Sequence, residues 1–277
     1  MRAAVLALLI AAAGAGTGRA GVASQDTGRW RGGAAALVFD AGVSENDRRE
    51  VRRAARAWNA ALGPGAGIRF DERSGASGDR VLVLRVASLD GRNRCRATVG
   101  RSAVPLKAKL YPGERLAPGS GGEAQGYVVL SGRCSYRSLV HELGHVLGLR
   151  HEHERTDRDA WVSIRPAADR EPDPLLWRNY VKRYDVSGAA PVRDRSGIAA
   201  TRRLLFTRAY DPCSVMQYVE DPAHARRGVA LSFTPLSRRF AAENRCPLGG
   251  LGGRVSSGDV RTVLALYGGR VLLQAAH

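Results

Sequence analysis

The chain of 277 residues is poor in several residue types, and each shortage narrows what the protein can be. Only 6% of the residues are aromatic, and only three of the 43 basic residues are lysines, namely Lys107, Lys109 and Lys182. Although the net charge is +17, the arginines are spread along the whole chain, without an aromatic-interleaved basic strand or a nucleic-acid motif. We therefore do not expect nucleic acid as a partner. The bias toward Ala, Arg and Gly also favours a bacterial source.

Long apolar segments are missing as well. The run Ala3–Ala13 is too short for a bilayer, which takes about 20 apolar residues, so we expect no membrane span. This run follows Arg2 and precedes small residues, which is the layout of a secretory signal peptide. The sequence predicts a signal peptide over residues 1–20, with cleavage as late as residue 23. The mature domain would cover 21–277 and be secreted, or reach the periplasm or cell surface in a bacterium.

The chain has only four cysteines, an even number: Cys95, Cys134, Cys213 and Cys246. In an exported chain four cysteines predict disulfides, and three pairings are possible. A zinc site made of four thiolates is the alternative, but no C-x-x-C spacing occurs in the sequence. We therefore expect a disulfide-bonded protein.

The hydrophobic pattern predicts an α+β N-terminal half, a loop-rich C-terminal half, and a boundary near the histidines. Clusters of β-branched and aromatic residues predict four strands, over residues 34–40, 67–70, 80–87 and 125–130. Helical spacing of apolar residues predicts four helices, over residues 44–62, 135–149, about 175–184 and about 256–267. Ser44 and Ser256 each begin an S-x-x-D capping box.

Histidine is rare too, yet three of the six histidines lie in the stretch HELGHVLGLRHE, from His141 to Glu152. His141 and His145 are four residues apart on an expected helix, so both rings project from one face. Gly148 can adopt a left-handed conformation and end the helix, which lets the chain bring His151 back toward the same point. Three histidines and one open position are typical of a catalytic zinc site, with one Zn²⁺ per chain.

Two further residues of this stretch bear on the chemistry. Glu142 lies beside the first ligand, where its carboxylate can act as general base toward a water molecule without binding the metal. His153 is a candidate fourth ligand, but a fourth protein ligand would close the site, so we expect it outside the metal shell.

The stretch HELGHVLGLRHE resembles the elongated zinc motif of the metzincin proteases, and Glu152 at its end is the mark of the astacin family. The continuation HEHERTDRDAWVSI is similar to the astacin sequence, and SVMQY (Ser214–Tyr218) resembles the family's Met-turn, S-x-M-H-Y. The resemblance implies a two-lobed metzincin zincin fold. Its N-terminal lobe, about 21–148, would hold a mixed twisted sheet and the active-site helix. Its C-terminal lobe, about 149–277, would be mostly irregular with a closing helix.

The resemblance also implies roles for single residues. Met216 would form the hydrophobic floor beneath the zinc, and Tyr218 would supply a phenol that hydrogen-bonds the transition-state oxyanion. Glu152 would hold the freed N-terminal amine. One family disulfide is implied as Cys95–Cys134, which leaves Cys213–Cys246 as a pair peculiar to this chain. The chain departs from the family at Gln217, where the Met-turn has His, and we expect activity to survive this change.

These features predict a secreted zinc metalloendopeptidase of the astacin type, acting as a monomer on a protein or peptide bound extended in the cleft between the lobes. Residues 95–99 would form the edge strand along which the substrate lies. The first alternative is a catalytically silent zinc-containing binding or adhesion module, and the second is a cationic protein that binds polyanions.

Overall fold

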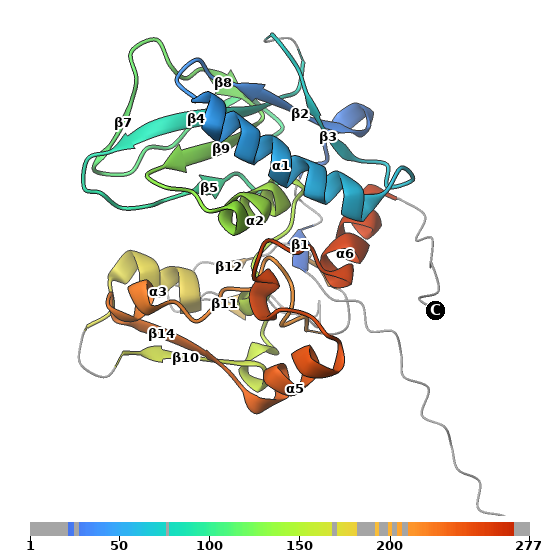
Figure 1. The fold of residues 1–277 in the computed structure, drawn as a ribbon, viewed down its shortest axis with the longest axis vertical. Coiled ribbons are helices and arrows are strands. Elements are labelled where there is room, and N and C mark those ends of the chain that lie inside the picture. Colours follow the sequence, from blue (N-terminus) through green and yellow to red (C-terminus); the bar gives the residue numbers. More distant parts are fainter. Residues whose placement is uncertain are drawn as a thin grey trace, which may run out of the picture.

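The structure is a computed structural model, and it describes residues 22–24, 28–75, 78–167, 171–181, 192–193, 199–200, 204–206 and 210–268. Its upper half in Figure 1 is a sheet with two helices across one face, and its lower half has few strands and several short helices. The expected signal peptide over 1–20 lies outside the described residues. None of the helices in the described part combines the length and apolar character that a membrane span needs.

A mixed, six-stranded sheet forms the upper half, in the order β3-β2-β4-β9-β5, with β7 paired to β4. The pairs β2–β3, β2–β4 and β4–β9 are parallel, whereas β5 pairs antiparallel with β9 and is the edge strand of this path. The central strands β4 and β9 are almost wholly buried, as expected of parallel strands that are apolar along their length. The strand bounds are β2 Ala34–Phe39, β3 Arg69–Glu72, β4 Val81–Ser88, β5 Arg96–Ala97, β7 Glu114–Leu116 and β9 Gly126–Ser131.

Two helices pack on one face of this sheet, α1 (Glu45–Leu62) and α2 (Tyr136–Val146) (Figure 1). The Ser44 side chain caps α1 by accepting a hydrogen bond from the Asp47 backbone N–H. Trp58 of α1 is fully buried, and its indole N–H donates to the Val140 carbonyl of α2 at 2.7 Å. This contact fixes the helix that carries the zinc motif against the largest core cluster.

The opposite face of the sheet has a smaller core that includes Leu84, Tyr127 and Val129. It lies under the segment of the two-stranded sheet β6 (Leu106–Lys107) and β8 (Glu123–Ala124), because Leu106 and Ala124 pack on this core. The sheet is therefore covered on both faces.

The lower half has its own core around the antiparallel pair β10 (Val162–Pro166) and β14 (Val229–Phe233). The helices α3 (Pro174–Val181), α4 (Pro222–Ala225) and α5 (Pro235–Glu243) surround this pair, as Figure 1 shows for α3 and α5. The remaining short elements are β1 Val22–Ser24 with β13 Leu204–Phe206, β11 Val192–Arg193 with β12 Ala199–Ala200, and 3-10 helices over Arg31–Gly33, Glu152–Glu154, Arg158–Ala160 and Leu248–Gly250.

The closing helix α6 (Ser257–Tyr267) begins with a complete capping box between Ser256 and Asp259. Although it comes last along the chain, its Val263, Leu264 and Leu266 belong to the core of the upper half. The last helix therefore packs in the upper half, although the segments that precede it along the chain lie in the lower half.

The described elements match the expected ones closely in the upper half and less well below. The zinc-motif helix ends at Val146, three residues before the expected end, because Gly148 already turns the chain. The helix α5 and the pair β10–β14 were not expected. Thr234 caps α5 and Pro235 is its first residue. This pair is a local helix-start signal that the spacing of apolar residues does not reveal.

Candidate metal centre and active site

The first two metal-ligand candidates lie on α2, which Ser135 caps by accepting a hydrogen bond from the Ser138 N–H. His141 and His145 are both buried, with 5% and 7% of their surface exposed, and their ring centroids are 4.8 Å apart. One helical turn separates them, so both rings project from the same face of the helix.

The third candidate reaches the same point because the chain reverses at Gly148. This glycine has φ +101°, a conformation that other residues rarely adopt, and its N–H donates to the His145 carbonyl at 2.8 Å. His151 then lies with its ring 4.6 Å from that of His145 and 5.1 Å from that of His141. The nearest ring nitrogens of the three histidines all lie within 4.8 Å of one another.

Each histidine ring has two nitrogens, and the hydrogen bonds of Nδ1 indicate that Nε2 is the nitrogen that can bind a metal. The Nδ1 atoms of His141 and His145 lie 2.8 Å from the carbonyl oxygens of Val215 and Leu149, so each Nδ1 carries the proton. His151 Nδ1 faces the Glu154 carboxylate at 3.3 Å. The Nε2 atoms are thereby left as acceptors, and those of His145 and His151 are only 3.0 Å apart. Two unprotonated nitrogens so close repel unless a cation lies between them, so the residues fit a zinc ion.

Glu142 is buried beside this group, between α2 and the edge strand β5. It is 7% exposed, and burial raises the pKa of its carboxyl to about 8, against the lowering effects of the Ala97 backbone N–H and of Arg96 and Arg137. A cation on the neighbouring histidines would favour the ionised carboxylate. Glu142 is thus a poorly solvated carboxylate with a backbone donor from β5, a suitable environment for a general base.

A tight turn over residues 211–217 lies under the metal site, with Met216 nearly inaccessible at 1% exposure. Met216 packs so closely on Gly144 of α2 that a Cβ at position 144 would overlap the Met216 sulfur. Asp259 of α6 holds the turn by accepting hydrogen bonds from the Ser214 hydroxyl and from the Val215 N–H. Since Val215 in turn accepts from His141, α6 orients a metal-ligand candidate through two hydrogen bonds.

Tyr218 follows this turn and lies among aromatic rings. Its ring centroid is 4.4 Å from that of His151, 4.2 Å from that of His153 and 5.0 Å from that of Tyr180. Burial raises the pKa of the Tyr218 phenol well above its usual 10, so the phenol stays protonated and can donate a hydrogen bond. The structure therefore brings Tyr218 beside the histidine group.

Glu152 connects the metal loop to the turn beneath it. Its backbone N–H donates to the Met216 carbonyl at 3.2 Å, and its Oε1 accepts from the Asp211 N–H at 2.9 Å. The residue is wholly buried, and burial raises the pKa of its carboxyl to about 8, partly offset by Arg155 at 3.5 Å. Its Oε2 has no hydrogen-bond partner within the described part of the chain.

His153 lies outside the metal group. It is fully buried, its ring stacks on His151 with centroids 5.1 Å apart, and its Nε2 lies 3.2 Å from the Asn179 carbonyl. Within the described ranges, the group of candidate ligands contains only His141, His145 and His151. His153 therefore lines the site and packs against both His151 and Tyr218.

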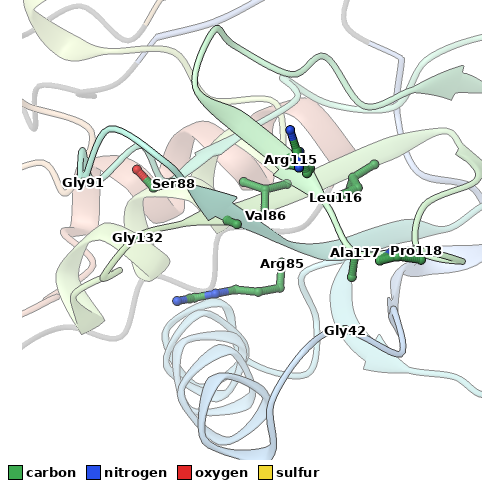
Figure 2. A pocket seen from close by; sticks show the side chains of 11 residues that line it. Gly42, Arg85, Val86, Ser88, Gly91, Arg115, Leu116, Ala117, Pro118 and Gly132 are labelled. Carbon is green, nitrogen blue, oxygen red and sulfur yellow. The ribbon is translucent and has the colours of Figure 1, made fainter.

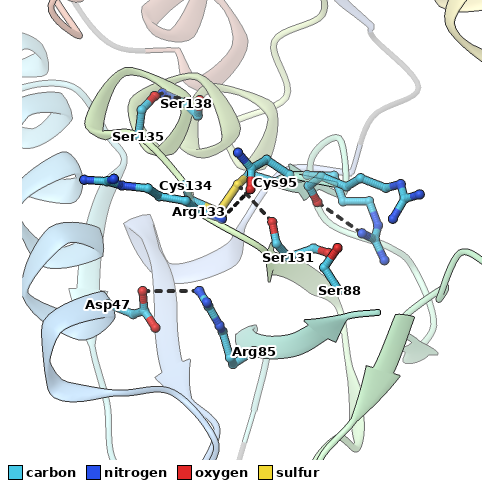
Figure 3. The surroundings of a disulfide bond; sticks show 12 residues. Asp47, Arg85, Ser88, Cys95, Ser131, Arg133, Cys134, Ser135 and Ser138 are labelled. Atoms are coloured by element: carbon cyan, nitrogen blue, oxygen red, sulfur yellow. Dashed lines mark hydrogen bonds and ion pairs between the residues drawn. A yellow bond between two sulfur atoms is a disulfide. The ribbon is translucent and has the colours of Figure 1, made fainter. Parts of the chain in front are cut away.

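Two disulfides hold segments on either side of the site. Cys95–Cys134 joins the start of β5 to the residue before the cap of α2, as Figure 3 shows. Cys213–Cys246 joins the turn under the metal site to the chain after α5. The first is the pair that the family resemblance implied, and the second is the remaining pair, which we expected to be peculiar to this chain.

The sequence analysis missed several residues that shape the site. Arg137 of α2 donates to the carbonyls of Gln217 and Gly249, and Tyr210 donates to the Gln217 side chain. Asp211 and Asp259 were not singled out either. The Arg137 contacts join distant segments of the chain, and the Tyr210–Gln217 contact lies within one irregular turn, so no helical or strand periodicity predicts either.

A separate hollow of about 600 Å³ lies away from the metal centre, beside β4 and β7 (Figure 2). Val86, Ala87, Leu116 and Pro118 form much of its apolar wall, and Arg85 and Arg115 lie at its rim. Arg85 is paired with Asp47 at 3.4 Å. None of the metal-site residues lines this hollow.

The fold and the site together define a metzincin: a mixed sheet backed by a zinc-motif helix, a glycine turn to a third histidine, and a Met-turn beneath. The structure is similar to that of high choriolytic enzyme 1, a hatching enzyme zinc-protease of Oryzias latipes, with a TM-score of 0.52 and 20% identity over 88% of this chain and 94% of that one. At this identity the likeness shows the fold.

The family model of astacin, peptidase family M12A, matches residues 119–182, which include the whole zinc motif. A zinc metalloproteinase nas-8 of Steinernema carpocapsae is 28% identical over 191 residues, 69% of this chain and 34% of that protein. Nematocyst expressed protein 6 of Nematostella vectensis is 38% identical over 71 residues, 26% of this chain and 19% of that protein. The chain spans about a third or less of the length of these relatives. Over residues 119–182, which carry the zinc motif, the chain therefore matches the astacin family.

Proposed function

We propose that this protein is a zinc metalloendopeptidase that hydrolyses peptide bonds within protein or peptide substrates. One observation carries the proposal: three histidine Nε2 atoms converge beside a buried glutamate that does not share in the group. A purely structural zinc site closes its fourth position with protein, whereas three ligands with an adjacent carboxylate suit hydrolysis.

His141, His145 and His151 would hold the zinc through Nε2. When bound, zinc supplies Lewis-acid polarisation of the scissile carbonyl and lowers the pKa of water to near 7. Glu142 accepts the proton of the attacking water and delivers it to the leaving nitrogen. The Tyr218 phenol, kept protonated by burial, donates a hydrogen bond to the oxygen that becomes negative as the carbonyl is attacked.

The substrate would lie extended along β5. This strand is the edge of the sheet, its Ala97 N–H contacts Glu142, and an edge strand offers backbone groups to an added peptide strand. Arg96 fixes the position of the strand, since its guanidinium makes two hydrogen bonds to Glu114, at 2.8 and 2.6 Å. The arrangement supports backbone recognition of a peptide beside the base.

We also propose that the protein acts outside the cytosol as a monomer, after loss of a signal peptide over 1–20 or up to 23. Two disulfides fit an oxidising compartment. The buried, unpartnered Oε2 of Glu152 supports the family role of this residue, which is to receive the freed N-terminal amine. N-terminal sequencing of the exported protein tests the cleavage site, and sedimentation tests the oligomeric state.

The decisive experiment compares wild-type protein with Glu142→Ala on a quenched fluorescent peptide library, with bound zinc quantified in both. Loss of a general base predicts a fall in kcat/KM of about 10²–10⁴-fold with zinc retained. Glu243→Ala on the exposed side of α5 is the matched control and should leave kcat/KM unchanged. Zinc bound in wild type and mutant with no cleavage by either would overturn the peptidase and favour a silent binding module.

A further inference from the structure

The backbone around Gln217 and Tyr218 is held by several hydrogen bonds. The Gln217 N–H donates to the Ser214 carbonyl at 3.1 Å, and the Gln217 carbonyl accepts from Arg137 Nη2 at 2.8 Å. The Gln217 side-chain Nε2 donates to the Tyr218 carbonyl at 2.8 Å. The residue that precedes the proposed oxyanion donor is thus bonded through its main chain and its side chain.

The Gln217 amide uses both of its polar atoms. Nε2 donates to the Tyr218 carbonyl, which leaves Oε1 to accept the hydroxyl of Tyr210. Because a carbonyl can only accept, this pair of contacts also fixes which amide atom is oxygen and which is nitrogen. Gln217 is 0% exposed, so a lost partner would leave a buried polar group unpaired.

The donor on the other side of the amide is itself rigid. Tyr210 is 1% exposed, and its ring stacks on Trp161 with centroids 5.4 Å apart and planes 7° apart. Arg155 lies over the same ring at 5.7 Å. The Tyr210 ring is therefore held in place by the lower core, and its hydroxyl fixes the Gln217 amide relative to that core.

Arg137 ties the same peptide unit to the metal helix. It lies on α2 one turn before His141, and besides the Gln217 carbonyl it donates through Nε to the Gly249 carbonyl at 2.9 Å. The peptide before Tyr218 is thus clamped between the zinc-motif helix and the lower core. By contrast, the Tyr218 hydroxyl makes no hydrogen bond with any other residue that the structure describes, so its place depends on its backbone and on ring contacts.

We propose that Gln217 is a positioning residue that sets the reach of the Tyr218 phenol, through the bond from its side chain to the Tyr218 carbonyl. The inference rests on the proposed peptidase function. What the position needs is one donor and one acceptor in fixed places. A neutral imidazole also offers one of each, so a histidine here is chemically equivalent, whereas a methionine of similar size offers neither.

The test is a set of variants measured for kcat, KM and zinc content. Gln217→Met should lower kcat by about 10–100-fold, because small misplacement of a transition-state donor is costly. KM should change less than about twofold and zinc content should not change, since the lost contact acts in the transition state. Gln217→His should restore kcat to within about threefold of wild type. Tyr210→Phe, which removes only the donor to Oε1, should give a smaller loss of the same kind.

A double-mutant cycle separates positioning from general damage. Tyr218→Phe removes the group through which Gln217 acts, so adding Gln217→Met to it should lower kcat less than about twofold further. Losses that multiply in the double variant would overturn the proposal, because Gln217 would then act independently of the phenol. A Gln217→His variant as slow as Gln217→Met would overturn it as well.

A spectroscopic readout keeps this proposal separate from the peptidase function. In protein with ¹³C-labelled tyrosine rings, the Tyr218 signal is identified by its loss in Tyr218→Phe. It should shift in Gln217→Met and stay within its wild-type range in Gln217→His. If wild type with bound zinc cleaves no peptide, the proposed function fails while this ring signal still decides the positioning role. An unchanged Tyr218 signal in Gln217→Met would overturn it.

Discussion

The two halves of the molecule are stabilised in different ways. The upper half is an apolar sandwich in which Val81, Val83 and Val128 of the sheet pack against Trp58 and Leu143 of the helices. In the lower half, buried charge is common. Most of the buried Asp, Glu and Arg residues in the described part of the chain come after Leu149, namely Arg150, Glu152, Glu154, Arg155, Arg158, Asp211 and Asp259; Asp40, Glu142 and the Glu114 side chain are the ones before it.

This difference has a physical reason. Regular strands and helices satisfy their own backbone groups, so the upper half needs only apolar side chains between its layers. The turns under the metal site leave many N–H and C=O groups without regular partners, and buried side chains supply them. Asp259 accepts from the backbone N–H groups of Val215 and Ser256, and also from the Ser214 hydroxyl. In the lower half, buried polar side chains thus stabilise the irregular turns that carry Met216, Tyr218 and His151.

The largest effect should come from breaking the apolar half at Trp58. Replacing Trp58 by Ala removes a fully buried ring and leaves the Val140 carbonyl without its donor. The free energy of unfolding should fall by about 5 kcal/mol, from cavity formation together with the unpaired acceptor. Denaturant titration measures it, and Leu251→Ala at a 52% exposed position is the control. A loss no greater than that of the control would contradict a core held by this packing.

The two disulfides give a matched comparison between the halves, since they span similar separations of 39 and 33 residues. Replacing either pair by serines should lower the free energy of unfolding by about 4 kcal/mol. Their kinetic effects should differ. Loss of Cys95–Cys134 frees the strand proposed to bind substrate and should raise KM, whereas loss of Cys213–Cys246 frees the Met-turn and should lower kcat. Identical kinetic effects would argue against this division of roles.

The contribution of an ion pair to stability should also differ between the two halves. Arg155 is 1% exposed and bonds Asp157 at 2.7 Å, with Glu152 at 3.5 Å, so Arg155→Met leaves buried acid without its cation and should cost about 3 kcal/mol. Arg52 on α1 makes equally short pairs with Glu45 and Glu72, but its side chain is 32% exposed. Arg52→Met should therefore cost much less stability than Arg155→Met. Equal losses in denaturant titrations would contradict the distinction.

The last prediction concerns how the stability of the protein depends on pH. Burial raises the pKa of Asp259 to about 6, from an ordinary 3.8, with the nearby Asp211 carboxylate adding to the rise. A raised carboxyl pKa contributes stability that is fully present below about pH 3.8 and is lost as pH rises through about 6. The free energy of unfolding of wild type, relative to Asp259→Asn, should therefore fall between about pH 4 and pH 6 and level off above.

Denaturant titrations in EDTA measure this difference, with histidine titration common to both proteins. Because Asp211 and Asp259 are neighbours that share Ser256, the step that is observed belongs to the pair. Parallel curves for wild type and Asp259→Asn over this range would show that Asp259 does not titrate there.

The upper half was largely predictable from sequence because its signals are local. The Ser44 cap and the apolar stripe through Val51 and Trp58 predicted α1, and the valine-rich run 81–86 predicted β4. Two of the candidate zinc ligands followed from their spacing on one helix, and the third from its distance beyond Gly148, where the chain turns. The roles of Met216 and Tyr218 needed the family resemblance, since SVMQY alone predicts no more than a packed methionine and tyrosine.

The lower half was harder to predict because its contacts join distant segments. Glu152 with Asp211, Asp259 with Val215, and Gln217 with Tyr210 each pair residues that no local pattern links. The strands β10 and β14 pair across more than 60 residues and have only 5 residues each, and they were missed. The sequence shows that Gln217 departs from the family's Met-turn. The two hydrogen bonds of its side-chain amide are seen only in the structure.

By itself, the sequence determined the metal chemistry of this protein: three histidines at positions 141, 145 and 151, with a glutamate at 142 and a glycine at 148. Helical periodicity and the backbone freedom of glycine are sufficient to bring such residues together. Only the tertiary structure decided how that centre is supported, through Asp259 on Val215, Met216 against Gly144, and Gln217 between Tyr210 and Tyr218. Such contacts depend on which buried groups remain to be satisfied once the chain has folded, and this is a property of the whole molecule.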